Sequence, residues 1–139
     1  MSLHTISLIK NGLNEKGKDI SKSSVLVLGL AYRSGVKEIR KSPGVKIAKE
    51  LKMFAKNVFA YDPLFTEKEI KSMGFSYKEN FADIDCIVVT TKEKKFVDLN
   101  WTTVANEVST KVIVDTQNII SYEKLHGLGF SIRRIGYAK

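Results

Sequence analysis

The chain is short of the residues that build disulfide scaffolds and metal centres. Cys86 is its only cysteine, and it has two histidines and two prolines among 139 residues. Because one cysteine cannot form an intrachain disulfide or a cysteine-based metal cluster, both devices are excluded. Cys86 lies in the apolar run Ile84–Val89, where a buried structural thiol is expected rather than a nucleophile. His4 and His126 lie far apart, with no metal-ligand motif around either.

The sequence also lacks a long hydrophobic run and is short of acidic residues. No apolar segment approaches the length of about 20 residues that a membrane-spanning helix needs, and no signal-peptide pattern is present. We therefore expect a cytoplasmic protein that does not enter a membrane. Lys and Arg number 23 against 15 Asp and Glu, which gives a net charge of +8.

This positive charge favours an anionic partner, and a lysine-rich solvated surface is the alternative. The basic residues are spread along the chain and are not interleaved with aromatic residues, so a nucleic-acid-binding function is disfavoured.

The chain does contain short apolar runs that alternate with amphipathic segments. Its length is that of one domain. Short apolar runs are typical of strands buried on both faces, and amphipathic helices lie between them. This alternation predicts an α/β fold, a Rossmann-like three-layer sandwich with a mainly parallel sheet, preceded by a short N-terminal helix. Strands are expected at residues 25–28, 58–61, 75–77, 86–90, 112–115 and 130–135. Helices are expected at residues 5–16, 43–57, 66–73, 99–108 and 121–125.

Polar residues follow four of the predicted strands. They are the loop 32–40, Asp62–Pro63, Thr90–Thr91 and Asp115–Asn118. Because ligands of open parallel sheets bind beyond the carboxyl ends of the strands, these four segments should converge on one functional edge. Asp62 occupies the place of a ribose ligand in such folds, although the proline after it makes a turn-forming role at least as plausible.

The loop after the first strand carries two arginines, Arg33 and Arg40. Guanidinium groups bind phosphate oxygens bidentately. Ser42 and Pro43 are a typical helix start, and the first amides and dipole of that helix also favour anions. The loop is therefore predicted to bind phosphate, with solvated surface charges as the alternative.

Other nucleotide and catalytic signatures are missing. The glycines of the loop do not form a G-x-G-x-x-G fingerprint. The sequence has no Ser-His-Asp arrangement with a local signature, no Walker loop and no metal-ligand spacing. We therefore assign no catalytic residue and no metal site.

Several segments, in order, resemble the UDP-glucose/GDP-mannose dehydrogenase family. Gly29–Pro43 resembles the G-L-A-[FY]-K…D-x-R-x-S-P element that opens the family's carboxyl-terminal, nucleotide-sugar-binding domain. Val58–Pro63 resembles its V-x-x-Y-D-P strand end, and Asp85–Thr91 resembles its A-D-x-x-[IV]-x-x-T-x strand. Asp115–Asn118 resembles its D-x-R-N turn.

The resemblance implies the C-terminal UDP-sugar-binding domain of an NAD-dependent nucleotide-sugar 6-dehydrogenase, of the UDP-glucose or UDP-N-acetylmannosamine type. Such enzymes oxidise the C6 alcohol of the sugar to a carboxylate. NAD is bound mainly by an N-terminal domain, and the catalytic cysteine belongs to a middle domain, so this chain alone is expected to be inactive. The full-length enzyme is expected to be a homodimer, and the fragment a monomer. The alternative is a stand-alone Rossmann-like nucleotide-binding or regulatory module without catalysis.

The resemblance also implies roles for four residues. Tyr32, Arg33 and Gln117 are expected on the substrate side, and Arg40 is expected to reach toward NAD. Gln117 stands where the family usually has a substrate-binding arginine.

By the same resemblance, residues 1–24 are a leader and the tail of a connecting helix, and residues 25–139 are the nucleotide-sugar-binding domain. The apolar side of the leading helix, formed by Ile6, Ile9 and Leu13, is then expected to be partly exposed and to favour weak self-association.

Overall fold

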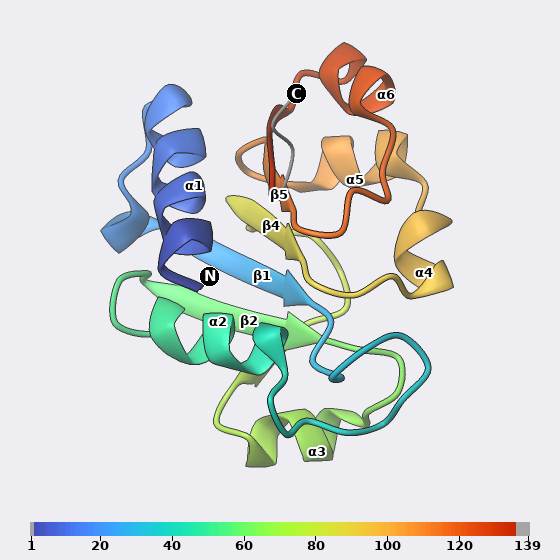
Figure 1. Ribbon diagram of the computed structural model, residues 1–139. Helices are drawn as coiled ribbons and strands as arrows, with labels where there is room; N and C mark the ends of the chain where they lie inside the picture. The colour runs from blue at the N-terminus through green and yellow to red at the C-terminus, as the bar shows by residue number, and fades with distance from the viewer. Residues whose placement is uncertain (1, 136–139) are drawn as a thin grey trace.

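The computed structural model describes residues 2–135; Met1 and residues 136–139 of the predicted domain lie outside them. These residues form a central sheet with helices on both faces (Figure 1). The strands are β1 Ser24–Leu28, β2 Asn57–Tyr61, β3 Ser76–Tyr77, β4 Cys86–Val89, β5 Val112–Asp115 and β6 Ser131–Arg134. They pair in the order β3-β2-β1-β4-β5-β6, and every pairing between them is parallel. This doubly wound order confirms the predicted Rossmann-like fold.

Helices from the two halves of the chain cover opposite faces of the sheet. They are α1 Ser2–Glu15, the 3₁₀ helix Ile20–Lys22, α2 Pro43–Leu51, α3 Glu67–Ser72, α4 Lys94–Val97, α5 Trp101–Glu107 and α6 Tyr122–Gly127. Side chains of α1, α2 and α3 pack on one face, and those of α4, α5 and α6 pack on the other. Among residues 2–135, no helix has both the length and the apolar character to cross a membrane.

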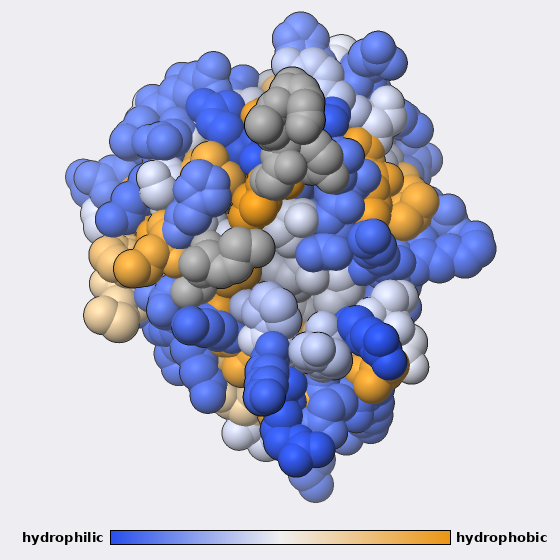
Figure 2. Space-filling model, in the orientation of Figure 1, coloured by the Kyte–Doolittle hydropathy of each residue, from blue (hydrophilic) through white to orange (hydrophobic). Residues whose placement is uncertain are grey.

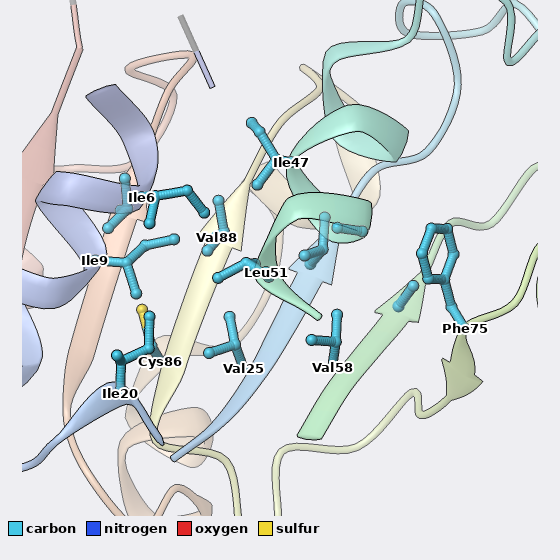
Figure 3. Packing of buried hydrophobic residues seen from close by; sticks show 14 of the residues in the cluster. Ile6, Ile9, Ile20, Val25, Ile47, Leu51, Val58, Phe75, Cys86 and Val88 are labelled. Atoms are coloured by element: carbon cyan, nitrogen blue, oxygen red, sulfur yellow. The ribbon is translucent and has the colours of Figure 1, made fainter. Parts of the chain in front are cut away.

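The core consists of two apolar layers separated by the sheet. Val25 and Val27 of β1 point into the layer under α1 and α2, whereas Leu26 and Leu28 point into the opposite layer. Figure 3 shows the first of these layers, in which residues of β1, β2 and β4 meet side chains from both helices. Because both faces are covered, the central strands are apolar without interruption, as the sequence pattern indicated.

Helix α1 is part of this core. Ile6, Ile9 and Leu13 are 2%, 0% and 0% exposed, so the expected exposure of their apolar side is wrong. The helix contacts α2, β5 and β6. Gly12 permits the close approach of α1 to β5, because a Cβ atom at this position would lie only 2.7 Å from Cγ1 of Val112. The helix thus finds its apolar partners within the chain itself.

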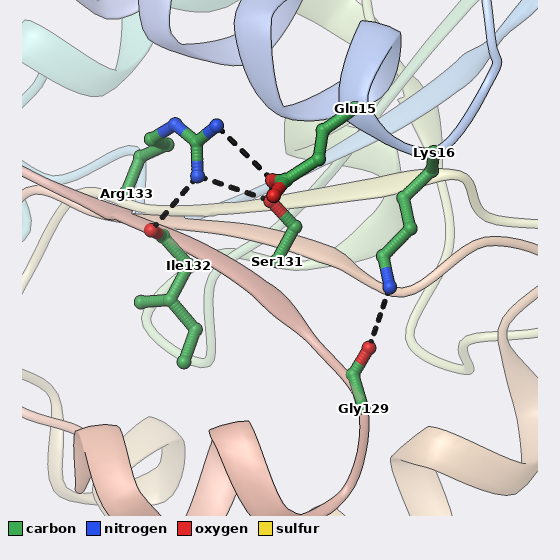
Figure 4. Close-up of polar contacts among 6 residues, drawn as sticks. All are labelled: Glu15, Lys16, Gly129, Ser131, Ile132 and Arg133. Carbon is green, nitrogen blue, oxygen red and sulfur yellow. Dashed lines mark hydrogen bonds and ion pairs between the residues drawn. The ribbon is translucent and has the colours of Figure 1, made fainter.

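Polar contacts fasten the end of α1 to β6 (Figure 4). Oγ of Ser131 donates a hydrogen bond to Glu15 Oε1, and Arg133 Nη2 lies 3.1 Å from the same oxygen. Lys16 Nζ donates to the carbonyl of Gly129 at 2.8 Å. The hydrogen bonds from Ser131 and then Arg133 lower the pKa of the Glu15 carboxyl below its ordinary value.

One helix end and one whole helix differ clearly from the sequence-based expectations. The helix expected to reach Asn57 ends at Leu51, because the amides of Lys56 and Asn57 both donate to the carbonyl of Ser23 and begin the sheet. The apolar residues after Leu51 continue the helical spacing and made the helix look longer. Helix α4 was not predicted; it has four residues, of which Phe96 is buried.

Candidate functional site

The parallel sheet brings the four polar strand ends to one edge of the molecule. Every strand points the same way, so the segments after β1, β2, β4 and β5 lie at the same edge. The loop after β1 runs outward between α3 and α4 before it returns to α2 (Figure 1). The convergence expected from the sequence is therefore present, and β1 lies where the strand order reverses, at the switch point of the fold.

The first turn of α2 packs tightly on the end of β1. Gly29 has a φ of 113°, and a Cβ atom on Gly44 would lie 2.0 Å from the Gly29 carbonyl oxygen. Ser42 Oγ donates to the carbonyl of Leu30 at 2.7 Å and accepts from the amide of Val45 at 3.1 Å. The predicted helix start at Ser42 is confirmed, and its cap uses an amide of α2 that would otherwise be free.

Asp62 acts as a structural carboxylate at the end of β2. The residue is 0% exposed. Its Oδ2 accepts from the amides of Leu30 and Ala31 at 2.7 and 2.9 Å, and its Oδ1 accepts from Leu64 at 2.8 Å. The structure supports the turn-forming interpretation, because both oxygens are engaged and a ribose could not reach them.

Asp115 plays the same part at the end of β5. Its two oxygens accept hydrogen bonds from four consecutive amides, at distances of 2.8 to 3.0 Å. The donors are the amides of Gln117, Asn118, Ile119 and Ile120. The backbone that carries Gln117 is therefore fixed by a buried carboxylate rather than by a ligand.

Two of the sequence-predicted site residues share a groove. Arg40 and Gln117 both line a groove of about 760 Å³ beside α1 and α2. Lys41, Lys46 and Lys49 line it as well, and no acidic residue of the described part of the chain does. Apolar residues such as Ile39, Val45 and Ile47 also line the groove. The groove therefore combines an apolar surface with one neutral amide and four cationic side chains, and the cations favour an anionic ligand.

The other two predicted residues, Tyr32 and Arg33, lie outside the lining of this groove, on the loop after β1. Tyr32 is 48% exposed. A backbone bridge joins Arg33 to Val36 and closes a tight turn. Within residues 2–135, the Arg33 side chain forms no ion pair, whereas Arg40 pairs with Glu38 at 3.1 Å. Arg40, at the end of the loop, thus lines the groove with Gln117, whereas Tyr32 and Arg33, at its beginning, do not.

Sequence reasoning missed two acidic residues that contact this loop. The amide of Gly35 donates to Glu93 Oε2 at 2.6 Å, and Lys37 Nζ lies 2.9 Å from Glu69 Oε2. Both acids follow polar strand ends closely in the sequence. Their position after the strand ends was the one indication in the sequence that they could contact the loop. It is a weak indication, because most acidic residues in such positions are solvated surface charges.

The single thiol of the chain does not belong to the polar loops at this edge of the sheet. Cys86 is 0% exposed in β4, as predicted, and burial raises the pKa of its thiol well above the ordinary value. A buried and protonated thiol is a poor nucleophile. Within residues 2–135, no three His, Cys, Asp or Glu side chains are grouped to hold a metal ion.

The fold and its polar edge define a doubly wound α/β domain, of the class that binds nucleotides beyond the carboxyl ends of its strands. The chain belongs to the UDP-glucose/GDP-mannose dehydrogenase family: the UDP binding domain of that family matches residues 26–122. This match includes the loop after β1 and the turn that carries Gln117, and it confirms the resemblance seen in the sequence.

Individual relatives agree with this assignment. The UDP-glucose 6-dehydrogenase of Rickettsia conorii is 30% identical over 85% of this chain and 29% of its own length. The UDP-N-acetyl-D-mannosamine dehydrogenase of Pyrococcus horikoshii is 29% identical over 98% of this chain and 31% of its own length. The chain therefore spans about 30% of the relatives that it matches.

Solved structures show the same fold. The UDP-D-ManNAc dehydrogenase of Pyrococcus horikoshii superimposes with a TM-score of 0.77 at 27% identity, over 96% of this chain and 30% of that one. An NDP-N-acetyl-D-galactosaminuronic acid dehydrogenase of Methanosarcina mazei Go1 has a TM-score of 0.78 at 19% identity, over 96% of this chain and 29% of that one. At that identity the second likeness supports the fold alone.

Proposed function

We propose that this chain is the substrate-binding domain of an NAD-dependent nucleotide-sugar 6-dehydrogenase, of the UDP-glucose or UDP-N-acetylmannosamine type. Its part is to hold the nucleotide end of a UDP-sugar while other domains oxidise the C6 alcohol. The observation that carries the proposal is the match of residues 26–122 to the family's UDP binding domain. A stand-alone regulatory module has no comparable support, because the relatives named above are dehydrogenases.

The site residues take the following roles in this proposal. The guanidinium of Arg33, which forms no ion pair with any other described residue, binds a phosphate oxygen, and Tyr32 beside it in the sequence offers an exposed ring and hydroxyl. Gln117 contributes its side-chain amide as a donor, and its backbone amide is held by Asp115 Oδ1 at 3.0 Å. Arg40 extends from the rim of the groove toward NAD. The lysines of the groove supply positive potential that the neutral Gln117 does not.

The rest of the enzyme is also part of the proposal. NAD is held mainly by an N-terminal domain, and a middle domain supplies the catalytic cysteine and a homodimer interface. Residues 1–24 are then the leader and the tail of the connecting helix, and residues 25–139 are the UDP-sugar domain. The chain alone is a monomer without dehydrogenase activity, and the whole enzyme works in the cytoplasm.

The test is an assay of the product of the native gene for NAD⁺ reduction at 340 nm, with UDP-glucose and with UDP-N-acetylmannosamine. We expect turnover with one of these sugars and none from the 139-residue chain. In the intact enzyme, Arg40→Ala should raise KM for NAD⁺ by about tenfold, the effect of one charge-assisted hydrogen bond.

The matched control is Lys22→Ala, which removes an exposed cation just before β1, at the opposite edge of the sheet. Absence of NAD⁺ reduction with every UDP-sugar would refute the proposed function. An equal effect of both substitutions on KM would refute the role of Arg40.

A further inference from the structure

The loop formed by residues 32–41 has almost no hydrophobic anchor of its own. Its polar side chains are exposed except that of Glu38, which is half-buried. Its two aliphatic side chains, Val36 and Ile39, are each 36% exposed and are not part of the core. Figure 2 shows a mostly hydrophilic surface over the lower part of the molecule, where this loop lies. A segment with few buried side chains is normally mobile, so polar contacts contribute much of what fixes the position of this loop.

Glu93 supplies the first of these contacts. Helices α2, α3, α5 and α6 each begin with a residue whose side chain accepts a hydrogen bond from the helix's own backbone. Glu93 occupies the same position before α4, yet it makes no such bond. Its Oε2 instead accepts the amide of Gly35 at 2.6 Å. The carboxylate of Glu93 therefore binds the backbone of the loop and does not cap the helix that follows it.

Glu69 supplies the second contact from the other side. Its Oε1 accepts the amide of Thr66 at 2.8 Å and completes the capping box of α3. Its Oε2 pairs with Lys37 Nζ at 2.9 Å. The hydrogen bond from Thr66 and then the one from Lys37 lower the pKa of the Glu69 carboxyl. One carboxylate thus joins the start of α3 to the loop.

The topology makes these two contacts a matched pair. Strands β2 and β4 flank β1 in the sheet; Glu69 follows β2, and Glu93 follows β4. The loop after β1 is therefore held from both sides by acids of the neighbouring connections. Because Glu38, Glu69 and Glu93 bind other donors, Arg33 is left without an ion pair among the described residues.

We propose that Glu93 and Glu69 are positioning residues that hold the loop 32–41 so that Arg33 presents an unpaired guanidinium to the diphosphate of a nucleotide ligand. This inference rests on the proposed function, because it takes the loop to be a ligand-binding loop. Holding the loop in its binding position before the ligand arrives removes part of the ordering cost of binding.

The sign of the effect separates positioning from simple electrostatics. Removing a carboxylate beside a cationic loop makes the local potential more positive, which by itself strengthens the binding of an anion. If Glu93 positions the loop, Glu93→Ala weakens UDP binding in spite of this gain. Glu93→Gln keeps an acceptor oxygen for the Gly35 amide and removes the charge, so it retains or strengthens binding.

The experiment is isothermal titration of UDP into the 139-residue chain and its variants. We expect Glu93→Ala to weaken UDP affinity by about five- to tenfold, because the binding-competent loop position is populated less. Glu69→Ala should act in the same direction. The matched control is Glu67→Ala, which removes a carboxylate of the same helix that pairs with Lys71 at 2.8 Å and does not contact the loop.

Amide hydrogen exchange of Gly35 gives a second readout that needs no ligand. Glu93→Ala should increase its exchange rate, whereas Glu93→Gln and Glu67→Ala should not. Unchanged or stronger UDP binding by Glu93→Ala, with wild-type binding intact, would overturn the positioning role and leave the proposed function standing. Absence of UDP binding by the wild-type chain and by the intact enzyme would overturn both.

Discussion

At the scale of single residues, two buried aspartates organise the functional edge. Asp62 accepts three backbone amides and Asp115 accepts four. An acidic residue at the end of a parallel strand can either bind a ribose or accept hydrogen bonds from the following turn. The burial and the hydrogen-bond partners of its carboxylate show which of these roles it has. Here both carboxylates are buried and accept hydrogen bonds from the backbone. We therefore propose that the basic side chains on the loops contact the ligand.

We expect Asp62→Ala to destabilise the fold by about 2 kcal/mol or more, because the buried amides of Leu30 and Ala31 lose their acceptor and each costs about 1–3 kcal/mol. Urea unfolding at pH 7 measures this difference. The control is Asp98→Ala, which removes an exposed carboxylate paired with Lys94 and should change stability by less than about 1 kcal/mol. Equal stabilities of the two variants would contradict the structural role of Asp62.

At the scale of elements, α1 is the helix whose role differs most from the sequence-based expectation. Its apolar residues pack against α2 and β5, and its end is fastened to β6 (Figure 4). Helical periodicity showed which residues form the apolar side. It could not show what covers that side, because the partners lie far along the chain: α2 begins at Pro43 and β5 at Val112.

Gly12→Ala should destabilise the chain by about 1–3 kcal/mol, the usual cost of overpacking. The added Cβ atom meets Cγ1 of the buried Val112 at 2.7 Å, and the higher helix propensity of alanine, about 1 kcal/mol, offsets part of that cost. Gly127→Ala is the control, because nothing lies within 4 Å of its Cβ position. A Gly12→Ala protein as stable as the control would contradict the close packing of α1.

Glu15→Gln tests the polar fastening of α1 through its dependence on pH. Hydrogen bonds from Ser131 and Arg133 lower the pKa of Glu15 in the folded state below 4.5. The ionised carboxyl therefore stabilises the fold above the unfolded pKa, and this stabilisation is lost as the pH falls through the folded pKa. Wild type should melt above Glu15→Gln at pH 7, and the gap should narrow as the pH falls through the lowered pKa of the folded state.

Glu123→Gln, an exposed change on α6, should show no such pH-dependent difference in melting temperature. A gap between wild type and Glu15→Gln that stays constant from pH 7 into the acid range would count against the role of the ionised carboxyl.

The sequence predicted best those helices and strands whose residue patterns are long or strong. The apolar strands and the capped start of α2 at Ser42 were predicted because their patterns are local and strong. The end of α2 was misplaced, because Phe54 and Ala55 continue the helical spacing after the backbone has left the helix. Helix α4 was missed, because four residues are too few to show a period.

The candidate site was predictable to a similar degree. The parallel order of the strands gathers the polar loops at one edge, which could be expected from the alternation of strands and helices. The contacts of Glu69 and Glu93 with the loop could not, since they join segments separated by 32 and 58 residues. Such pairs become visible only when the fold places the connections after β2 and β4 beside the one after β1.

At the scale of the whole molecule, the chain is a doubly wound domain of the UDP-glucose/GDP-mannose dehydrogenase family that spans about 30% of its relatives. Its central strand ends in a basic loop held between two neighbouring connections. The central claim is that this loop, through Arg33, makes the domain a binder of uridine nucleotides.

The most direct test is the melting temperature of the 139-residue chain with UDP, UDP-glucose, UDP-N-acetylmannosamine, GDP and NAD⁺. A ligand at 100 times its Kd stabilises the folded state by about 2.7 kcal/mol. The account predicts a shift with the uridine nucleotides that is lost in Arg33→Ala and kept in Lys22→Ala. An equal shift in Arg33→Ala, or no shift with any uridine nucleotide, would contradict it.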